Sequence, residues 1–226
     1  MTFFEETLHN ITTVPISILD TIIPLTKYTL LDLSTMNTAL TELNMADADI
    51  CQSYIDTVLI KKDASVAYGG YLEQRGLYAT NSHFNKEGAA LRNIHLGVDF
   101  WAVAGTKILT PISGKVHSFM NNDTKGDYGP TIILSHNVTN IQFYTLYGHL
   151  SLESLNGLYI NQEFSAGEVI GSMGTPEINV NYAPHLHFQL INDIGAHKGN
   201  YPGVCTANDM EYFADNCPNP KFLLKV

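Results

Sequence analysis

The chain has 226 residues, of which 22 are acidic and 12 are basic, so its formal net charge is −10. A chain of this charge with no basic run repels phosphate backbones, and we therefore do not expect it to bind nucleic acids. Hydrophobic residues make up 45% of the sequence, which is enough for a packed core and argues against intrinsic disorder.

The N-terminus has no pattern typical of secretion or membrane insertion. The first six residues include two acids, and the first basic residue is Lys27, whereas a secretory signal needs early positive charge. The most apolar stretch, residues 11–33, is interrupted by Pro15, Asp20 and Pro24 and is too broken to span a bilayer. We therefore expect a cytoplasmic protein. Its three cysteines are too few for a disulfide framework, and we expect reduced structural thiols at Cys51, Cys205 and Cys217.

The first 80 residues are predicted to form an N-terminal extension of mixed α/β character. Residues 10–34 mix Thr, Ile and Pro and favour strand or extended structure. Apolar residues recur at helical spacing over residues 47–60, which predicts a helix capped by Asp47 or Asp49. The apolar stripe of this helix consists of Ile50, Cys51, Tyr54, Ile55, Val58 and Leu59. Residues 68–75 begin with a turn, and they either rim a binding groove or form a simple turn with an ion pair.

The pattern changes after residue 90, where short β-rich runs alternate with Gly, Pro, Asn and Asp. This alternation is typical of an antiparallel, mainly β domain, which we assign to residues 81–195. The predicted strands are residues 94–100, 107–109, 114–119, 131–135, 142–150, 169–173 and 185–191. No substantial helix is predicted between residues 95 and 195, and residues 196–226 are expected to wrap around the β domain.

Four of the nine histidines stand in patterns that favour a metal site. His95 and Asp99 are four residues apart, and His185 and His187 are two apart, so in a strand each pair points to one face. Two imidazoles and a carboxylate are a common ligand set for catalytic zinc, which keeps one position open for water. Further histidines beside the metal, such as His149, are suited to proton transfer or to stabilising an oxyanion.

A histidine that stands alone on a strand is more often a buried, hydrogen-bonded residue than a metal ligand. The two spaced pairs together, in a chain with β patterning, favour the metal site over this interpretation. The remaining five histidines have no matching partner and are assigned to surface or structural roles: His9, His83, His117, His136 and His197.

The order of several motifs from residue 95 to residue 191 resembles the lysostaphin/LytM-type zinc metallopeptidase family. These motifs are His95-x-x-x-Asp99, Ala104-Gly105-Thr106, Pro111-x-x-Gly114-x-Val116, Gly129-x-x-Ile132-x-Leu134-x-His136, Tyr147-Gly148-His149-Leu150-Ser151, Gly167-x-x-Ile170-Gly171-x-x-Gly174 and Pro184-His185-Leu186-His187-Phe188. The resemblance covers roughly 100 residues and implies a two-sheet antiparallel β domain. The flanking residues 68–75 and 200–205 look similar to a signal-less subgroup, often fused to kinase-like and aminotransferase modules.

The resemblance implies that one zinc ion is bound by His95, Asp99 and His187, with His149 and His185 as the catalytic pair. The family hydrolyses peptide bonds, typically in bacterial cell-wall cross-links and often beside glycine. Some members place a tyrosine shortly before the first ligand, which is missing here, so a tyrosine donor has to come from elsewhere, with Tyr147 and Tyr128 as candidates. The usual Thr-Gly before the last motif is Tyr182-Ala183 in this chain, which leaves the substrate preference open.

The expected function is therefore a zinc-dependent metalloendopeptidase that acts on peptidoglycan peptides or glycine-containing peptides. One alternative is a non-catalytic LytM-like binding or regulatory module, although such proteins usually lose ligands and all five positions are filled here. Another is a zinc amidase that acts on a small cytoplasmic amide. By analogy with relatives that are held latent by an upstream segment, we expect residues 1–80 to dock on the β domain and gate its groove.

Overall fold

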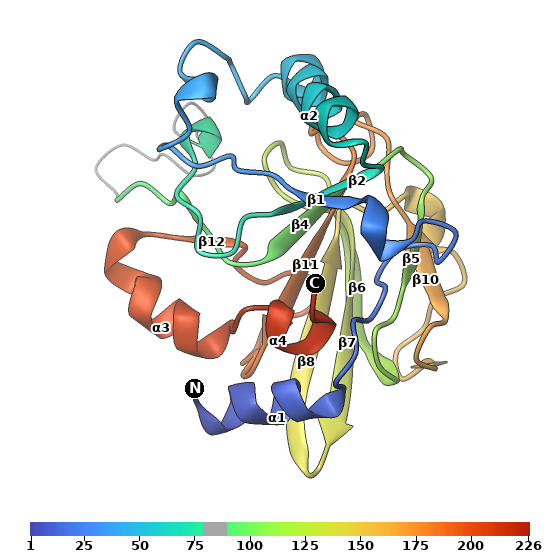
Figure 1. Ribbon diagram of the computed structural model, residues 1–226. Helices are drawn as coiled ribbons and strands as arrows, with labels where there is room; N and C mark the ends of the chain where they lie inside the picture. Colours follow the sequence, from blue (N-terminus) through green and yellow to red (C-terminus); the bar gives the residue numbers. More distant parts are fainter. Residues whose placement is uncertain (79–89) are drawn as a thin grey trace.

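A computed structural model describes residues 1–78 and 90–226 of the chain (Figure 1). Its main sheet has the strand order β1-β2-β4-β11-β8-β7-β6-β9, with antiparallel neighbours throughout except for the parallel pair β1–β2. The bounds of these strands are Tyr28–Leu30 (β1), Val66–Gly69 (β2), Val98–Trp101 (β4), His185–Ile191 (β11), Ile141–Gly148 (β8), Gly129–Val138 (β7), Gly114–Asn122 (β6) and Glu163–Phe164 (β9). This mainly β, antiparallel-rich fold confirms the predicted fold class.

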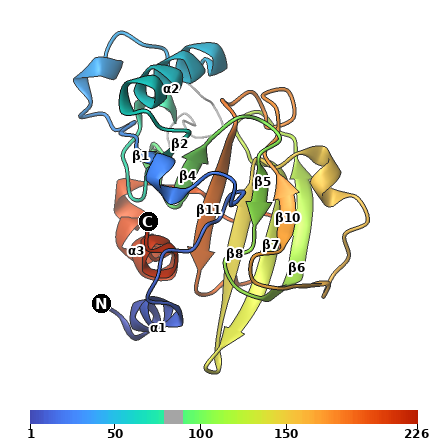
Figure 2. The same cartoon turned by 45° about the vertical axis from the view of Figure 1, so that its right-hand side comes forward.

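Two small sheets accompany the main one. Strands β5 (Lys107–Leu109) and β10 (Val169–Ser172) pair with each other and lie in front of the main sheet in Figure 2. Strand β3 (Ile94–His95) pairs with β12 (Val204–Cys205) near the C-terminus. The single strand predicted for residues 94–100 is therefore wrong in one respect, because β3 and β4 are separate and pair with different partners.

The predicted helix is confirmed as α2 (Ala48–Lys62), whose first backbone amides donate to the side chain of Asp47. Cys51 and Ile55 on its stripe are buried, but Ile50 is 37% exposed and does not belong to the packed face. Helix α1 (Phe3–Ile11) was not expected, and within residues 10–34 only β1 is a strand. Helices α3 (Met210–Asn216) and α4 (Lys221–Leu224) lie in the C-terminal segment.

The two faces of the main sheet are covered differently. One face holds the main hydrophobic core, which includes Phe100, Tyr147, Leu186 and Phe188 and is covered by α1, α4 and the β5–β10 pair. On the other face, a cluster around α2 includes Met45, Cys51, Trp101 and Ala183, and a second cluster includes Tyr128, Tyr201 and Cys217. The candidate site lies on this second face, between the two clusters.

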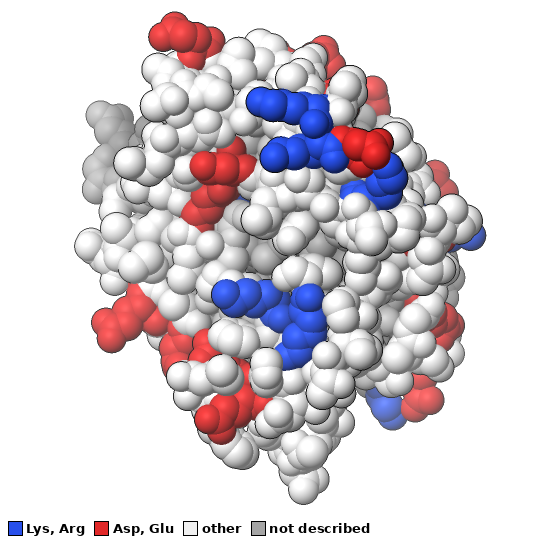
Figure 3. All heavy atoms as spheres, in the orientation of Figure 1, with Lys and Arg blue, Asp and Glu red and all other residues white. Residues whose placement is uncertain are grey.

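Residues 28–30 and 66–69 of the N-terminal extension contribute strands to the main sheet, and β2 pairs directly with β4. The division of the chain at residue 80 stays a prediction. Acidic and basic side chains are interspersed on the face shown in Figure 3. All three cysteines are buried and free. Within residues 1–78 and 90–226, no helix is long and apolar enough to cross a membrane.

Candidate metal centre

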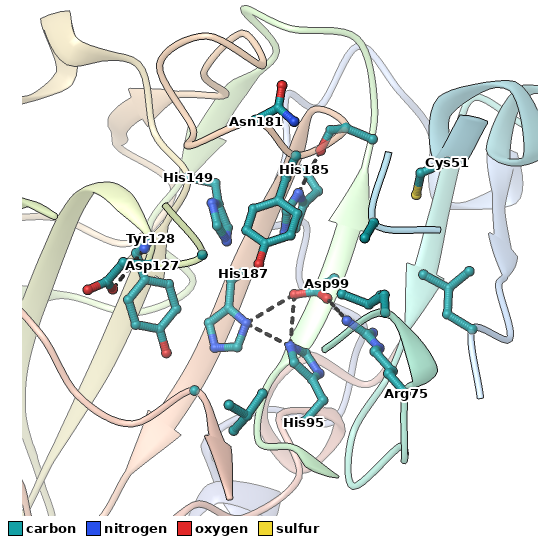
Figure 4. A pocket seen from close by; sticks show the side chains of 18 of the residues that line it. Cys51, Arg75, His95, Asp99, Asp127, Tyr128, His149, Asn181, His185 and His187 are labelled. Atoms are coloured by element: carbon teal, nitrogen blue, oxygen red, sulfur yellow. Dashed lines mark hydrogen bonds and ion pairs between the residues drawn. The ribbon is translucent and has the colours of Figure 1, made fainter. Parts of the chain in front are cut away.

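His95, Asp99 and His187 meet on one face of the sheet. His187 of β11 lies directly opposite Asp99 of β4, and His95 reaches them from the end of β3. His95 Nε2 lies 2.8 Å from His187 Nδ1 and 3.2 Å from Asp99 Oδ1, and His187 Nδ1 lies 3.0 Å from that same oxygen (Figure 4). All three side chains are at most 3% exposed. Among the described residues, no fourth His, Cys, Asp or Glu joins this group.

Hydrogen bonds on the far side of each imidazole fix its tautomer. His95 Nδ1 donates to the carbonyl oxygen of Gly70 at 2.9 Å, and His187 Nε2 donates to Gln189 Oε1 at 2.9 Å. The amide of Gln189 is oriented by its own nitrogen, which donates to the carbonyl of Pro202 and to Cys217. The ring nitrogens that face each other, His95 Nε2 and His187 Nδ1, therefore both carry lone pairs.

His95 Nε2, His187 Nδ1 and Asp99 Oδ1 thus lie within 3.2 Å of one another, and none of these three atoms carries a hydrogen. Such a group is stable when a cation lies at its centre. In a tetrahedral zinc site with bonds of about 2.1 Å, neighbouring ligand atoms are about 3.4 Å apart, slightly more than the distances here. Two nitrogens and one carboxylate oxygen are also donors that zinc prefers, so these residues fit the ion that the sequence predicts.

Two glycines allow the imidazoles to reach their positions. A Cβ atom at Gly97 would lie 2.7 Å from the His187 ring and 2.7 Å from the Phe188 carbonyl oxygen. A Cβ atom at Gly70 would collide with the guanidinium of Arg75, and this residue has a φ of +104°, which favours glycine. The absence of side chains at Gly97 and Gly70 is therefore required by the observed positions of the His187 ring and the Arg75 guanidinium.

Arg75 neutralises the carboxylate of the cluster from the side opposite the histidines. Its Nη1 donates to Asp99 Oδ2 at 2.6 Å, and its Nε donates to Glu73 at 2.7 Å. The other oxygen of Glu73 accepts the backbone amide of Leu33, so the arginine is held by the N-terminal segment. Arg75 is only 3% exposed, which makes this a buried ion pair. Because Arg75 also lines the cavity described below, the ion pair does not exclude a place at the rim of a groove.

Burial and the neighbouring charges shift the pKa values of Asp99 and His95. Burial alone would raise the pKa of Asp99, but His95 and Arg75 hold it well below its usual value. Burial lowers the pKa of His95 to about 4, and Arg75 acts in the same direction. The carboxylate is therefore charged and this imidazole neutral at neutral pH, which are the forms that bind a metal ion.

His149 and His185 lie beside the cluster, with their ring centroids 4.1 Å apart (Figure 4). His185 Nδ1 donates to the carbonyl of Ala183 at 2.7 Å, which leaves the lone pair on Nε2. His149 follows β8 in the left-handed region with a φ of +61°, a strained conformation for this residue type. Burial lowers the pKa of both imidazoles, so both are neutral at neutral pH.

Other predicted candidates lie in different places. The Tyr128 ring centroid is 5.1 Å from that of His187, whereas Tyr147 is fully buried in the main core with its hydroxyl near Thr145. Tyr128 is therefore the candidate donor of the two. His136 is buried and structural, His9 is exposed, and His117 is half-buried. His197 lines the cavity described below, and His83 lies outside the described residues.

The sequence analysis did not include three groups that hold His95, Asp99 and His187 in place: Arg75, the Gly70 carbonyl and Gln189. Gln189 continues the two-residue spacing of His185 and His187, so its position on the same face was readable from the strand pattern. The contact of Arg75 with Asp99 joins residues 24 positions apart and has no local sequence signal.

A cavity of about 300 Å³ opens over His95, Asp99 and His187. Its floor includes His95, Asp99 and His187 together with His149 and His185. One wall comes from the α2 side of the molecule and the other from residues 126–128 and 197–204. Figure 4 shows Cys51 on one side of the cluster and Asp127 and Tyr128 on the other.

Residues 93–200 match the model of peptidase family M23, and no curated protein matches the chain. Similar solved structures include the catalytic domain of lysostaphin from Staphylococcus simulans, with 25% identity, 54% of this chain and 80% of that chain covered and a TM-score of 0.37. LytU is 23% identical over 61% of this chain and 84% of its own, with a TM-score of 0.38. A mutant of the catalytic domain of prophage-encoded M23 protein EnpA from Enterococcus faecalis is 22% identical over 56% of this chain and 85% of its own, with a TM-score of 0.36. The matched residues 93–200 include His95, Asp99 and His187 and both neighbouring histidines, so the region that contains the candidate site is the region that resembles peptidase family M23.

Proposed function

We propose that this protein is a zinc-dependent endopeptidase in which His95, Asp99 and His187 bind one zinc ion. The observation that carries the proposal is the convergence of these three side chains, in which hydrogen bonds at His95 Nδ1 and His187 Nε2 leave a lone pair on the other nitrogen of each ring. Such an arrangement is unfavourable in an ordinary protein core, because each of these atoms is more stable when it accepts a hydrogen bond. The match of residues 93–200 to a peptidase family supports hydrolysis as the reaction.

A zinc ion bound here supplies a Lewis acid that polarises a carbonyl group and lowers the pKa of water. The protein side chains then have to position the peptide and move protons. The Arg75–Asp99 pair fixes the carboxylate ligand, and Gln189 fixes the His187 ring. These buried hydrogen bonds keep the ligands in place before substrate arrives, so that none of them reorients during the reaction.

His185 is proposed as the general base, because its Nδ1–H is held by the Ala183 carbonyl and its Nε2 lone pair is free to take a proton. Its indole neighbour Trp101 stacks on it at 5.8 Å and restricts its orientation. His149 is proposed to stabilise the negative charge that develops on the scissile carbonyl oxygen. The pKa of each imidazole is lowered by burial, which keeps His185 able to accept a proton at neutral pH.

The proposed substrates are peptidoglycan peptides or glycine-containing peptides. The test compares three panels, namely glycine-containing peptides, peptidoglycan stem and cross-link peptides, and small amides, each with and without chelator. We expect cleavage of peptides that chelator abolishes and added zinc restores, and loss of cleavage in His185→Ala. Cleavage of small amides alone would favour an amidase, and peptide binding without any cleavage would favour a non-catalytic module.

A further inference from the structure

The cavity over the metal cluster continues beyond the M23 domain match into the N-terminal segment. Leu33, Met45 and Cys51, which all precede the matched residues 93–200, line the cavity together with Trp101 and Ala183. We name these five residues the α2 subsite. They belong to the buried apolar cluster around α2, and each is less than 10% exposed.

The α2 subsite has the chemistry of an apolar side-chain pocket. Burial raises the pKa of the Cys51 thiol to about 11, so this side chain is uncharged and acts as part of the apolar wall. The nearest guanidinium, that of Arg75, is already paired with Asp99 and Glu73. The transfer of an apolar group from water into this pocket therefore breaks no ion pair of Arg75, and its free energy is favourable.

The opposite side of the cavity is chemically different. It is lined by Asp127 and Asn200, whose side chains approach each other at 3.4 Å, and by Tyr128 and His197. The same side also includes the apolar residues Tyr201, Pro202 and Val204. A peptide lying across His95, Asp99 and His187 therefore meets a mixed polar and apolar surface on one side and an apolar pocket on the other.

Trp101 connects the pocket to the reaction centre. Its ring lies in the α2 cluster and stacks on His185, with centroids 5.8 Å apart and an interplanar angle of 23°. Trp101 also lies opposite His185 in the pairing of β4 with β11. Because Trp101 lies beside His185, the proposed general base, a side chain packed against this indole would belong to a residue next to the bond that is cleaved.

We propose that the α2 subsite binds an aliphatic or aromatic side chain of the residue adjoining the scissile bond, so that the enzyme prefers peptides with an apolar residue there over all-glycine peptides. This inference rests on the proposed peptidase function, and three of the five residues to which it assigns specificity, Leu33, Met45 and Cys51, lie outside the family match. An apolar pocket discriminates by roughly ten- to 200-fold per buried methylene-sized group.

The experiment uses pentaglycine peptides in which one glycine is replaced at each position in turn by Ala, Leu or Phe. Mass spectrometry locates the cut, and initial rates give kcat/KM. We expect cleavage next to the substituted residue and at least about a tenfold higher kcat/KM for Leu or Phe than for Gly. Equal rates across the series, or a preference for glycine, would overturn the proposal while leaving the peptidase function intact.

A variant pair assigns the preference to this pocket. Ala48 lines the same cavity at the start of α2, so Ala48→Phe is expected to fill the pocket and abolish the preference for Leu over Gly. Ile50→Phe is the control, because Ile50 lies on the same helix but is 37% exposed and outside the cavity lining. An unchanged preference in Ala48→Phe would contradict the assignment.

A binding measurement keeps the proposal testable if no peptide is cleaved. The chain has a single tryptophan, so its fluorescence reports on Trp101. Titration with the Leu-substituted and all-glycine pentapeptides is expected to show tighter binding of the Leu peptide, and this difference is expected to vanish in Ala48→Phe. Equal affinities would refute the subsite, whereas a clear difference without cleavage would refute only the peptidase function.

Discussion

Removal of the Arg75 guanidinium is expected to destabilise the folded protein strongly even without metal. Arg75 and Asp99 form an ion pair of 2.6 Å in which the side chains are only 3% and 1% exposed. Arg75 also pairs with Glu73, whose side chain is 12% exposed. In Arg75→Met the side-chain length is roughly kept, but Asp99 is left as a buried carboxylate without its cationic partner.

The size of the effect follows from burial and not from the short distance. Breaking a buried ion pair by removing one partner costs about 3–5 kcal/mol of stability, because the remaining charge stays desolvated. The matched control is Lys27→Met, which removes a pair with Asp63 of nearly the same length, 2.7 Å, but with side-chain exposures of 38% and 93%. We expect almost no change in stability for this control, since solvent screens an exposed pair.

Urea denaturation of the zinc-free protein, followed by circular dichroism, measures both variants against the unmodified chain. For Arg75→Met we expect the free energy of unfolding to fall by about 3–5 kcal/mol. A loss as small as that of Lys27→Met would refute the claim that Arg75 compensates a buried carboxylate. Asp99→Asn combined with Arg75→Met tests the pairing itself, because the two changes are expected to be clearly non-additive.

Three further predictions concern acid stability and the support of the ligands. His136 is buried and burial lowers its pKa to about 4, so on acidification the unfolded chain takes up a proton at this residue before the folded chain does. The free energy of unfolding is therefore expected to fall by about 3 kcal/mol between pH 6.5 and pH 4. Urea denaturation at several pH values should show a weaker dependence on pH for His136→Gln. Gly97→Ala places a Cβ atom 2.7 Å from the His187 ring and is expected to weaken zinc binding by competition titration, whereas Gly76→Ala, with its nearest neighbour at 3.9 Å, should bind zinc normally. Gln189→Leu removes the acceptor of His187 Nε2 and is expected to lower zinc affinity by about 10- to 100-fold; an unchanged affinity would show that the tautomer is fixed in another way.

The sequence was most informative where local spacing determines geometry. The two-residue spacing of His185 and His187 placed both on one face of β11, and the helix at residues 48–62 begins after the expected cap, Asp47. His95 and Asp99 also converge, although for a different reason than expected. They lie in separate strands, and the break between β3 and β4 at Gly97 makes room for the His187 ring.

The sequence was least informative about contacts between distant segments. Arg75 reaches Asp99 only because β2 pairs with β4, and nothing near residue 75 indicates that partner. Strands β1 and β2 are short, at three and four residues, and their sequences do not show that they extend the main sheet. Helix α1 was missed although its start carries a readable sequence signal, because Thr2 and Glu5 form a capping box. That residues 1–80 gate the groove stays a prediction.

The central claim, that His95, Asp99 and His187 bind zinc and that His149 and His185 do not, is tested most directly by metal content. Elemental analysis of the chain and its five single alanine variants, purified without chelator, is the measurement. We predict one zinc ion per chain in the unmodified protein, in His149→Ala and in His185→Ala, and little zinc in the other three variants. A zinc-free His185→Ala beside a fully loaded His187→Ala, or an unmodified chain that takes up no zinc, would contradict this account.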